Sequence, residues 1–295
     1  MTRAAAAGSV VVVTGANSGF GRLIAELLAR RGHTVFATMR ELAGRNAPAA
    51  EALRSLAKSE SLALDAAELD VTREDSVESC IRAIESRAGR IDALVNNAGF
   101  GFVGLLESFS LEQAQRIFDT NVFGALRTIR AVLPSMRRNQ SGLLVQVSSG
   151  AGRVVLPAMG LYCATKFALE ALSECYRYEL AALGIDCVCV EPGAYPTEIF
   201  GKFEAGADAT REEGYGPARE LAARVGGTLA ASTADPMEVA TLVQTIVEMA
   251  PGERAARYGV GLRGPGVEAI NALAAQVQEG LLAGFGVAEI TRRAP

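Results

Sequence analysis

The chain has 295 residues, of which 49% are hydrophobic and 6% aromatic, with no tryptophan. This composition is typical of a folded enzyme and excludes a disordered or collagen-like chain. The formal net charge is −4 and the arginines are scattered, so we expect no nucleic-acid partner. No uninterrupted apolar run is long enough to cross a bilayer, so no membrane span is expected.

The five cysteines and the single histidine make a metal site or a disulfide framework a poor interpretation. Cys187 and Cys189 alternate within an apolar run, and we expect both to be buried free thiols. His33 stands just before a predicted strand and is interpreted as structural. Neither a histidine-dependent hydrolase nor a zinc enzyme is therefore predicted, and no metal ligand is assigned.

The first residues superficially resemble a signal peptide, because an arginine is followed by alanines and then valines. The apolar run leads directly into the sequence TGANSGFG, which cleavage would remove. We therefore interpret residues 1–8 as a short tail and expect a cytoplasmic protein.

A strand, a glycine-rich turn and a helix open the chain. Ser9–Thr14 is a β-branched run typical of a strand buried on both faces of a parallel sheet, and Arg22–Arg31 has helical periodicity. The turn between them presents backbone N–H groups and a positive helix end to a phosphate. Its GxxxGxG spacing is a variant of the dinucleotide fingerprint. The candidate cofactor contacts here are Gly15, Asn17, Ser18, Gly19, Phe20 and Gly21.

The second predicted strand, His33–Met39, ends next to Arg40. An acid at the end of this strand favours NAD through the ribose hydroxyls, whereas an arginine nearby favours the 2′-phosphate of NADP. Met39 occupies the position expected for the acid, so we predict NADP and consider NAD the weaker alternative. The competing interpretation is an exposed Arg40 that Glu41 neutralises.

A loop over Ala43–Ala50, a short helix over Glu51–Ser59 and a third strand over Ala67–Thr72 are expected next. Asp70 has two interpretations: its carboxylate accepts from an adenine amino group, or it caps the helix Arg73–Arg87 together with Thr72. Val71 is grouped with Asp70 as a cofactor contact.

The fourth predicted strand, Ile91–Val95, runs into two amides, an alanine and a glycine. These residues either form a turn or line the cofactor crevice. The candidate contacts are Asn97, Ala98 and Gly99. A long helical pattern follows over Ser110–Arg138, begins with a capping box, and carries Asn121 in its middle, where asparagine is unfavourable unless the side chain or a local kink has a role.

A serine, a tyrosine and a lysine follow the fifth predicted strand, Leu143–Val147. Ser149 lies at the carboxyl end of that strand, and Tyr162 and Lys166 are one helical turn apart. An ammonium near a phenol lowers the phenol pKa and makes tyrosine usable as an acid or base. An ordinary amphipathic pair is the alternative.

The sixth predicted strand, Ile185–Val190, leads to Pro192, Gly193 and Thr197, a further group of cofactor candidates. The following stretch, Gly201–Ala234, breaks the alternation of strands and helices and has only a loose helix over Pro217–Val225. Such an excursion at the carboxyl edge of a sheet is typical of a substrate lid, here about residues 194–234, and Tyr195 is a candidate pocket residue.

A helix from Asp235 to about Met249, a strand over Arg257–Val260 and a helix over Val267–Leu282 complete the pattern. We predict an α/β fold in which residues 1–295 form a single domain with one doubly wound sheet of about seven parallel strands, helices on both faces and the helical lid.

These motifs together resemble the short-chain dehydrogenase/reductase family, over roughly residues 9–197. The resemblance rests on TGANSGFG, LDVT, NNAG, Asn121, Ser149, YCATK and the PG pair with Thr197. It implies a Rossmann-type fold and an NADP-dependent oxidoreductase. It further implies that Tyr162 exchanges a proton with the carbonyl or alcohol oxygen and that Ser149 hydrogen-bonds that oxygen. Lys166 is implied to hold the nicotinamide ribose, with Tyr162 beside the cofactor, and Asn121 to anchor a water near Lys166.

Within the family, VFATMR and the Ser148–Glu170 stretch are similar to the branch of 17β-hydroxysteroid and retinol dehydrogenases. The expected partner is a small carbonyl or alcohol substrate. The helices near 110–138 and 159–182 resemble those that the family packs between subunits, so a homodimer or homotetramer is expected. The alternatives are a dinucleotide-sensing regulator without catalysis and a nucleotide-sugar epimerase or dehydratase on the same fold.

Overall fold

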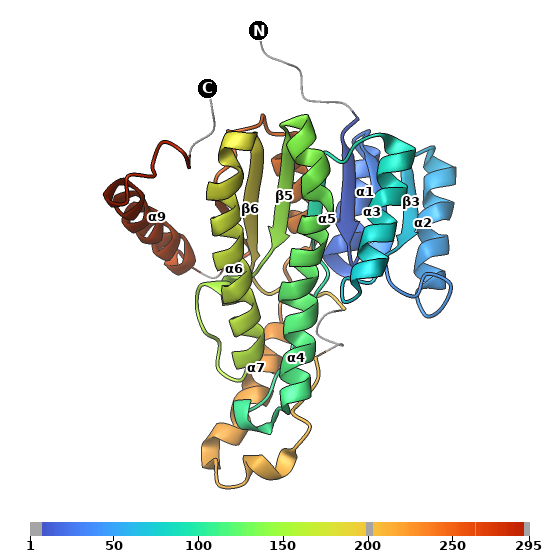
Figure 1. Cartoon of the computed structure of the whole chain (residues 1–295). Coiled ribbons are helices and arrows are strands. Elements are labelled where there is room, and N and C mark those ends of the chain that lie inside the picture. The colour runs from blue at the N-terminus through green and yellow to red at the C-terminus, as the bar shows by residue number, and fades with distance from the viewer. Residues whose placement is uncertain (1–7, 199–202, 263, 292–295) are drawn as a thin grey trace.

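The computed structural model describes residues 8–198, 203–262 and 264–291. Its centre is a sheet of seven parallel strands in the order β3-β2-β1-β4-β5-β6-β7 (Figure 1). This arrangement confirms the predicted doubly wound α/β fold. The strands are β1 (Val10–Thr14), β2 (Thr34–Met39), β3 (Leu64–Glu68), β4 (Ala93–Asn96), β5 (Gly142–Val147), β6 (Ile185–Pro192) and β7 (Arg257–Val260).

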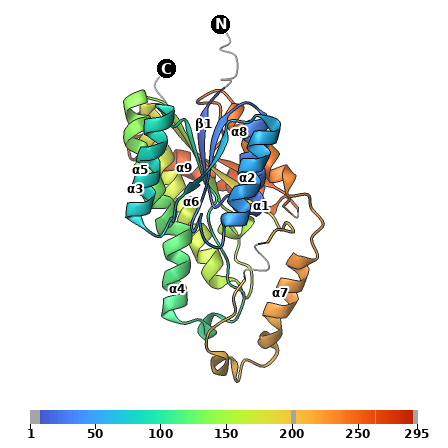
Figure 2. The same cartoon turned by 90° about the vertical axis from the view of Figure 1, so that its right-hand side faces the viewer.

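Helices cover both faces of the sheet (Figure 2). One face carries α1 (Gly19–Arg30), α2 (Ala47–Glu60) and α8 (Met237–Glu248), and the other carries α3 (Glu74–Ala88), α5 (Gly124–Asn139) and α6 (Gly160–Leu180). Two helices, α4 (Leu111–Phe118) and α7 (Leu221–Ala230), project beyond the end of the sheet, and α9 (Gly266–Gly284) lies at one side of the molecule (Figure 1).

The valines of β1 show why the sheet is buried on both faces. Val11 and Val13 pack into the apolar cluster under α1 and α8, whereas Val10 and Val12 pack into the cluster under α3 and α5. Each buried side chain of this size contributes about 1.5–3 kcal/mol through the hydrophobic effect. The predicted parallel, two-sided strand is therefore confirmed.

The third strand was predicted in the wrong place. It spans Leu64–Glu68 and not Ala67–Thr72, because Leu64 and Ala66 are the residues that turn into the core. Asp70 lies after the strand, where its Oδ1 accepts hydrogen bonds from the backbone N (3.0 Å) and the hydroxyl (2.8 Å) of Thr72. The alternative interpretation, in which Asp70 and Thr72 cap α3, is wrong, because the N-cap residue is Arg73 and no side chain makes a cap bond.

The helix predicted over Ser110–Arg138 is interrupted. The capping box is confirmed, since Ser110 and Gln113 exchange side-chain and backbone hydrogen bonds. A π-helical turn, Asp119–Phe123, then separates α4 from α5 and contains Asn121. Such turns are frequent at functional sites. The short helix predicted over Glu51–Ser59 starts earlier, at Ala47, with a proline in its first turn.

A buried group of charges holds α6 against the last two strands. The Arg257 guanidinium on β7 contacts Glu170 at 2.9 Å and Glu174 at 2.6 Å on α6, and its Nε lies 3.7 Å from Glu191 on β6. Glu170 and Glu191 are 2% and 0% exposed. Asn271 on α9 donates to the other Glu191 oxygen at 2.6 Å. Burial, reinforced by the neighbouring Glu170 charge, raises the pKa of Glu191 to about 7.

We predict that this raised pKa makes stability depend on pH. The folded protein retains a proton on Glu191 that the unfolded chain has lost above its ordinary pKa of 4.5. Its contribution to folding is therefore complete below that pKa and is lost as the pH rises toward 7. Urea unfolding between about pH 4.5 and 8 measures this slope. Glu191→Gln is expected to make the slope shallower while still accepting from Asn271. Equal slopes for the two proteins would contradict the prediction.

Candidate functional site

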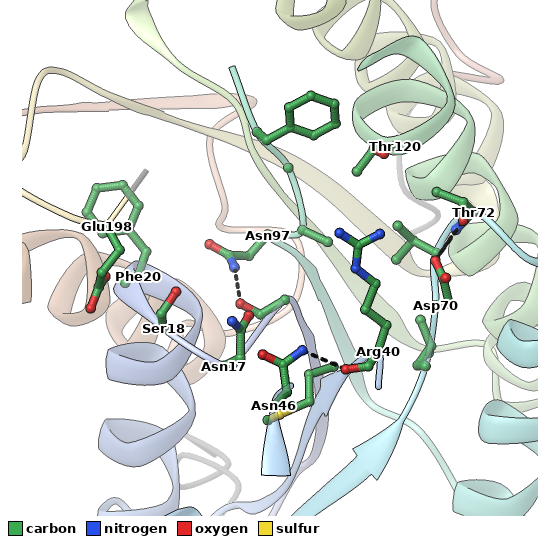
Figure 3. Close-up of a pocket in the computed structure, with 18 of the residues that line it drawn as sticks. Asn17, Ser18, Phe20, Arg40, Asn46, Asp70, Thr72, Asn97, Thr120 and Glu198 are labelled. Atoms are coloured by element: carbon green, nitrogen blue, oxygen red, sulfur yellow. Dashed lines mark hydrogen bonds between the residues drawn. The ribbon is translucent and has the colours of Figure 1, made fainter. Parts of the chain in front are cut away.

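A cavity of about 970 Å³ opens at the carboxyl ends of β1, β2 and β4 (Figure 3). This volume is at the upper end of the range for ligand sites. Most of the sequence-predicted cofactor residues line it: Gly15, Asn17, Ser18, Gly19, Phe20, Arg40, Asp70, Val71, Asn97, Ala98, Gly99 and Thr197. The cavity lies where the strand order reverses between β1 and β4, which is the position at which open α/β sheets bind ligands.

Hydrogen bonds join the end of β1 to the end of β4 beneath this cavity. The Thr14 hydroxyl accepts from the backbone N of Asn97 and of Ala98, each at 3.0 Å. The Asn97 side-chain amide donates to the carbonyls of Thr14 (2.9 Å) and Gly15 (3.2 Å). Asn97 therefore has a structural task in addition to lining the cavity. Asn96 points into the protein, where its amide donates to the Gln146 side chain at 3.1 Å.

Glycine is required in the turn between β1 and α1. Gly15 and Gly19 have φ angles of +65° and +55°, the left-handed region that side chains disfavour. A Cβ on Gly15 would lie 2.8 Å from the Ala98 Cα, and one on Gly21 would lie 2.4 Å from the Asn97 amide nitrogen. Gly21 does not line the cavity, so the structure gives it a packing task where cofactor contact was predicted.

The β2 end of the cavity is rich in arginine. Arg40 extends into the cavity (Figure 3), and its half-exposed side chain lies 3.9 Å from the Glu41 carboxylate. Arg45 also lines the cavity and contacts Glu41 at 3.2 Å. The carboxylate at the end of β3, Glu68, accepts from the backbone N of Glu41 (2.8 Å) and of Leu42 (2.6 Å). These bonds tie that carboxylate to the turn.

Other cavity residues were not predicted as cofactor contacts from the sequence, among them Arg45, Asn46 and Glu198. Arg45 and Asn46 follow Arg40 by five and six positions, in a stretch that was expected to be an ordinary loop. A cationic residue so soon after Arg40 was the available signal for Arg45. Glu198 lies beside Ser18 and Phe20 in the view of the cavity (Figure 3), and no sequence signal indicated it.

Ser149, Tyr162 and Lys166 meet at the carboxyl end of β5. Ser149 follows this strand directly, and Tyr162 and Lys166 occupy the first turns of α6. The Lys166 Nζ lies 5.7 Å from the centroid of the Tyr162 ring and donates to the Val147 carbonyl at 2.8 Å. The Ser149 hydroxyl accepts from the Ala151 backbone N at 3.1 Å. Tyr162 and Lys166, which were also predicted as cofactor contacts, are buried and do not line the cavity.

The expected lowering of the Tyr162 pKa is not found. Burial raises the pKa of this phenol to about 12, and the hydrogen bond with Ser149 only partly opposes the effect. Burial also lowers the pKa of Lys166 to about 8, against the opposing charge of Glu170. Desolvation dominates at this buried phenol, and the lowering by the ammonium that the sequence argument relied on does not occur. At neutral pH the phenol therefore carries its proton.

Asn121 is fully engaged in hydrogen bonds. Its amide nitrogen donates to the Phe100 carbonyl (2.9 Å) and the Thr165 hydroxyl (3.1 Å), and its oxygen accepts from the Phe100 backbone N (3.1 Å). The side chain thereby ties the π-helical turn to α6. A cavity of about 10 Å³ lies between Asn121, Lys166 and Val147, which is about the size that holds a single water.

The surroundings of Tyr162 are apolar. It packs in a cluster with Phe102, Ile117 and Met159, against which Phe203 and Leu229 from the chain after β6 also pack. Backbone hydrogen bonds such as Asp208 N to Ser108 O (3.0 Å) hold that part of the chain in place. The residues between 203 and 234 form two short 3-10 helices and α7. Residues 199–202 of the predicted lid lie outside the described residues.

Three residues at or just after the end of β6 have structural positions. Tyr195 was expected to line a substrate pocket, and this is wrong: it is 2% exposed in the main core and its hydroxyl donates to Glu238 at 2.8 Å. Gly193 donates to the Val260 carbonyl at 2.8 Å, and a Cβ there would overlap the Gly261 oxygen. Pro192 is the last residue of β6, and its carbonyl lies 3.5 Å from the Ser149 hydroxyl. Neither Pro192 nor Gly193 lines the cavity, where cofactor contacts were predicted.

Among the described residues, no group of histidine, cysteine, aspartate and glutamate is arranged to hold a metal ion. Cys187 and Cys189 are buried free thiols, as predicted. No helix within the described ranges combines the length and apolar character needed to span a membrane.

The model of the short chain dehydrogenase family matches residues 9–208, which include the glycine turn, Ser149, Tyr162 and Lys166. The chain belongs to this family. The match covers more than half of the sequence and agrees with the resemblance found in the motifs. The family binds nicotinamide dinucleotides, so the cavity and the glycine turn fit a cofactor of this class.

Curated relatives include a retinol dehydrogenase and an estradiol dehydrogenase. Human retinol dehydrogenase 8 is 41% identical over 204 residues, which are 68% of this chain and 63% of the relative. Estradiol 17-beta-dehydrogenase 1 of Rattus norvegicus is 36% identical over 243 residues, covering 80% and 70%. The chain thus matches less than two thirds of the length of the retinol dehydrogenase. The similarity supports the predicted branch of the family.

A solved short-chain dehydrogenase/reductase from Burkholderia phymatum, in complex with NAD, superposes with a TM-score of 0.75. It is 26% identical, and the match covers 92% of this chain and 94% of that one.

We predict that Gly15→Ala weakens dinucleotide binding and stability together. The new Cβ would overlap Ala98 and separate the glycine turn from β4. Gly32→Ala is a matched control, because Gly32 also has a positive φ (+88°) but nothing within 4 Å of an added Cβ. The control should lose only about 1–3 kcal/mol of stability, which is the cost of backbone strain. Calorimetric titration with NADPH and thermal unfolding measure both effects. Equal losses in the two variants would show that the approach to Ala98 is unimportant.

Proposed function

We propose that this protein is an NADP(H)-dependent oxidoreductase that interconverts a secondary alcohol and a ketone or aldehyde, with Tyr162 as the acid/base. The observation that supports it most is the convergence of Ser149, Tyr162 and buried Lys166 at the strand end next to the dinucleotide cavity. The cofactor, when bound, supplies or accepts the hydride. The chain's own residues then manage the proton and the charge on the substrate oxygen.

In the reducing direction, Tyr162 is the proton donor. The pKa of about 12 keeps its phenol protonated at neutral pH, so the acid is ready when a carbonyl oxygen gains negative charge. We propose that the Ser149 hydroxyl is a second donor to the same oxygen, because donors aimed at developing charge give the largest stabilisation. Lys166, whose pKa of about 8 lies close to neutrality, is proposed to hold the nicotinamide ribose and to exchange protons through the small cavity beside Asn121.

Arginine at the end of β2 supports NADP in preference to NAD. Arg40 reaches into the cavity, and Met39 occupies the position at which NAD-binding folds carry an acid. The nearby Glu68 carboxylate is bonded to the backbone of the turn. A guanidinium binds a phosphate in bidentate geometry. The proposed phosphate site therefore lies at Arg40, with Ser18 near it in the glycine turn.

The substrate is proposed to be apolar. The cluster around Tyr162 contains Phe102, Met159 and Phe203, and Leu229 of α7 packs against it. We propose that residues 194–234 act as its lid. The names of the relatives, a retinol dehydrogenase and an estradiol dehydrogenase, agree with a bulky apolar alcohol. We further propose a single cytoplasmic domain over residues 1–295 that assembles as a homodimer or homotetramer.

Two other functions on this fold are less well supported. A dinucleotide sensor does not need an acid beside the substrate site, yet Tyr162 is placed with Ser149 and Lys166. A nucleotide-sugar epimerase also uses a tyrosine and lysine, but the GxxxGxG spacing and the NNAG sequence argue against it. Consumption of NADPH with a ketone but not with a nucleotide sugar separates these functions from the proposed one.

We predict that Tyr162→Phe lowers kcat by about 10²–10⁴-fold, the usual contribution of a general acid. NADPH affinity and thermal stability should change little, because only the hydroxyl is removed. Tyr178→Phe, on the same helix, is the control; its hydroxyl donates to Glu174 and not to the proposed site. The assay follows NADPH absorbance with a panel of ketones, steroids, retinal and sugars. Full activity of the Tyr162→Phe variant would show that Tyr162 is not the acid.

We predict that Arg40→Ala weakens NADPH binding about 10- to 100-fold, the effect of losing charged hydrogen bonds of about 1.5–3 kcal/mol. NADH binding should change by less than about twofold, because NADH has no 2′-phosphate. Arg54→Ala, on α2 and outside the cavity, is the control for loss of a charge. Titrations with NADPH and with NADH measure the ratio of the two affinities in each variant. An equal loss for NADPH and NADH would show that Arg40 does not contact the phosphate.

A further inference from the structure

The most apolar face of α9 points away from the rest of the molecule. Ile270, Leu273, Val277 and Leu281 are 38%, 63%, 55% and 48% exposed. Their spacing of three, four and four residues places them on one side of the helix. We call these four residues the α9 stripe. Phe285 and Ile290 extend its apolar surface, with 78% and 71% exposure.

If α9 only covered the rest of the protein, its apolar face would point toward the protein. Instead, the side that faces the protein carries one buried apolar residue, Val267, and a hydrogen bond from Asn271 to Glu191. Figure 1 shows α9 at the side of the molecule, beyond α6 and β6. An ordered row of large apolar side chains that stays in water is unfavourable and marks an interaction surface.

The charges of α9 limit what can cover this stripe. Glu268 and Glu279 are the charged residues of the helix, and no lysine or arginine occurs between 266 and 284. Helices that lie on anionic bilayers use a cationic polar face, and α9 has no cationic residue to form one. By helical spacing, both glutamates lie on the side away from the stripe, where a partner of the same charge does not meet them.

The spacing of the stripe is self-complementary. In an antiparallel pair with its two-fold axis near residues 275 and 276, Ile270 lies opposite Leu281, and Leu273 lies opposite Val277 to within one residue. Such a pair also places the two helix dipoles in opposite directions. Each apolar side chain is therefore matched by an apolar one, with the glutamates outside.

The exposed area is sufficient for a specific contact. The stripe with Phe285 and Ile290 exposes roughly 600 Å² per copy, so two copies bury on the order of 1,200 Å², the lower limit for a stable protein interface. We propose that the α9 stripe is a homodimer interface in which it pairs antiparallel with the same stripe of a second copy. This surface is separate from the helices near 110–138 and 159–182, and it does not depend on the proposed activity.

The first test is the mass in solution by sedimentation at micromolar concentration. Leu273→Glu combined with Val277→Glu should halve the mass of the assembly, whether the native protein is a dimer or a tetramer. Ala275→Glu is the matched control, because this exposed residue lies on the same helix away from the stripe. It should leave the mass unchanged. A native monomer, or an unchanged mass in the double variant, would overturn the proposal.

A second test does not require a charged variant to fold. In a Cys175→Ser background, which removes the exposed native thiol, tagged Leu273→Cys protein is mixed with untagged Val277→Cys protein and oxidised. The antiparallel pair predicts that the mixed tagged–untagged cross-link exceeds either homodimer. A parallel pair in register would give mainly the Leu273→Cys homodimer and the Val277→Cys homodimer, and absence of cross-links would exclude close contact of the helices. Either of these results contradicts the proposal.

Discussion

The contact between the ends of β1 and β4 is the constraint on which the site depends. The sheet reverses its order at this point, and the Thr14 hydroxyl accepts from two successive backbone N–H groups of the β4 turn. Asn97 completes the junction by donating to the carbonyls of Thr14 and Gly15. Gly15 must be glycine because Ala98 leaves no room for a Cβ. The glycine turn is thus fixed where its N–H groups and the end of α1 face the cavity.

The helix α6 depends on a different interaction, the burial of charge. Lys166 is held at one turn by the Val147 carbonyl, and Glu170 is held one turn later by Arg257 of β7. Burying these groups is costly, and removing one partner would leave the other uncompensated. The same burial determines the chemistry, because it keeps the Tyr162 phenol protonated and brings the Lys166 pKa close to neutrality. The packing of this end of the sheet and the protonation of Tyr162 and Lys166 therefore have one physical origin.

Sequence reasoning identified the elements whose side-chain pattern is local. The valines of β1, the glycines of the turn, the Ser110 capping box and the pair Tyr162–Lys166 were all recognised. It misplaced β3 because LDVT contains strand-forming residues, although Asp70 and Thr72 bond to each other in a turn. It also missed the balance of desolvation and charge at Tyr162, which depends on residues distant in sequence. Arg45 escaped notice because its stretch was expected to be an ordinary loop, and Glu198 because only the folded chain brings it to the cavity.

The central claim is that the chain places a protonated tyrosine beside a carbonyl while a hydride arrives from NADPH. It is tested most directly by reduction of an apolar ketone with NADPH that carries deuterium at both C4 hydrogens of the nicotinamide ring. The account predicts one deuterium on the carbinol carbon of the product and a hydroxyl proton that comes from solvent. A product without deuterium at that carbon, or no product with any ketone of the panel, would contradict it.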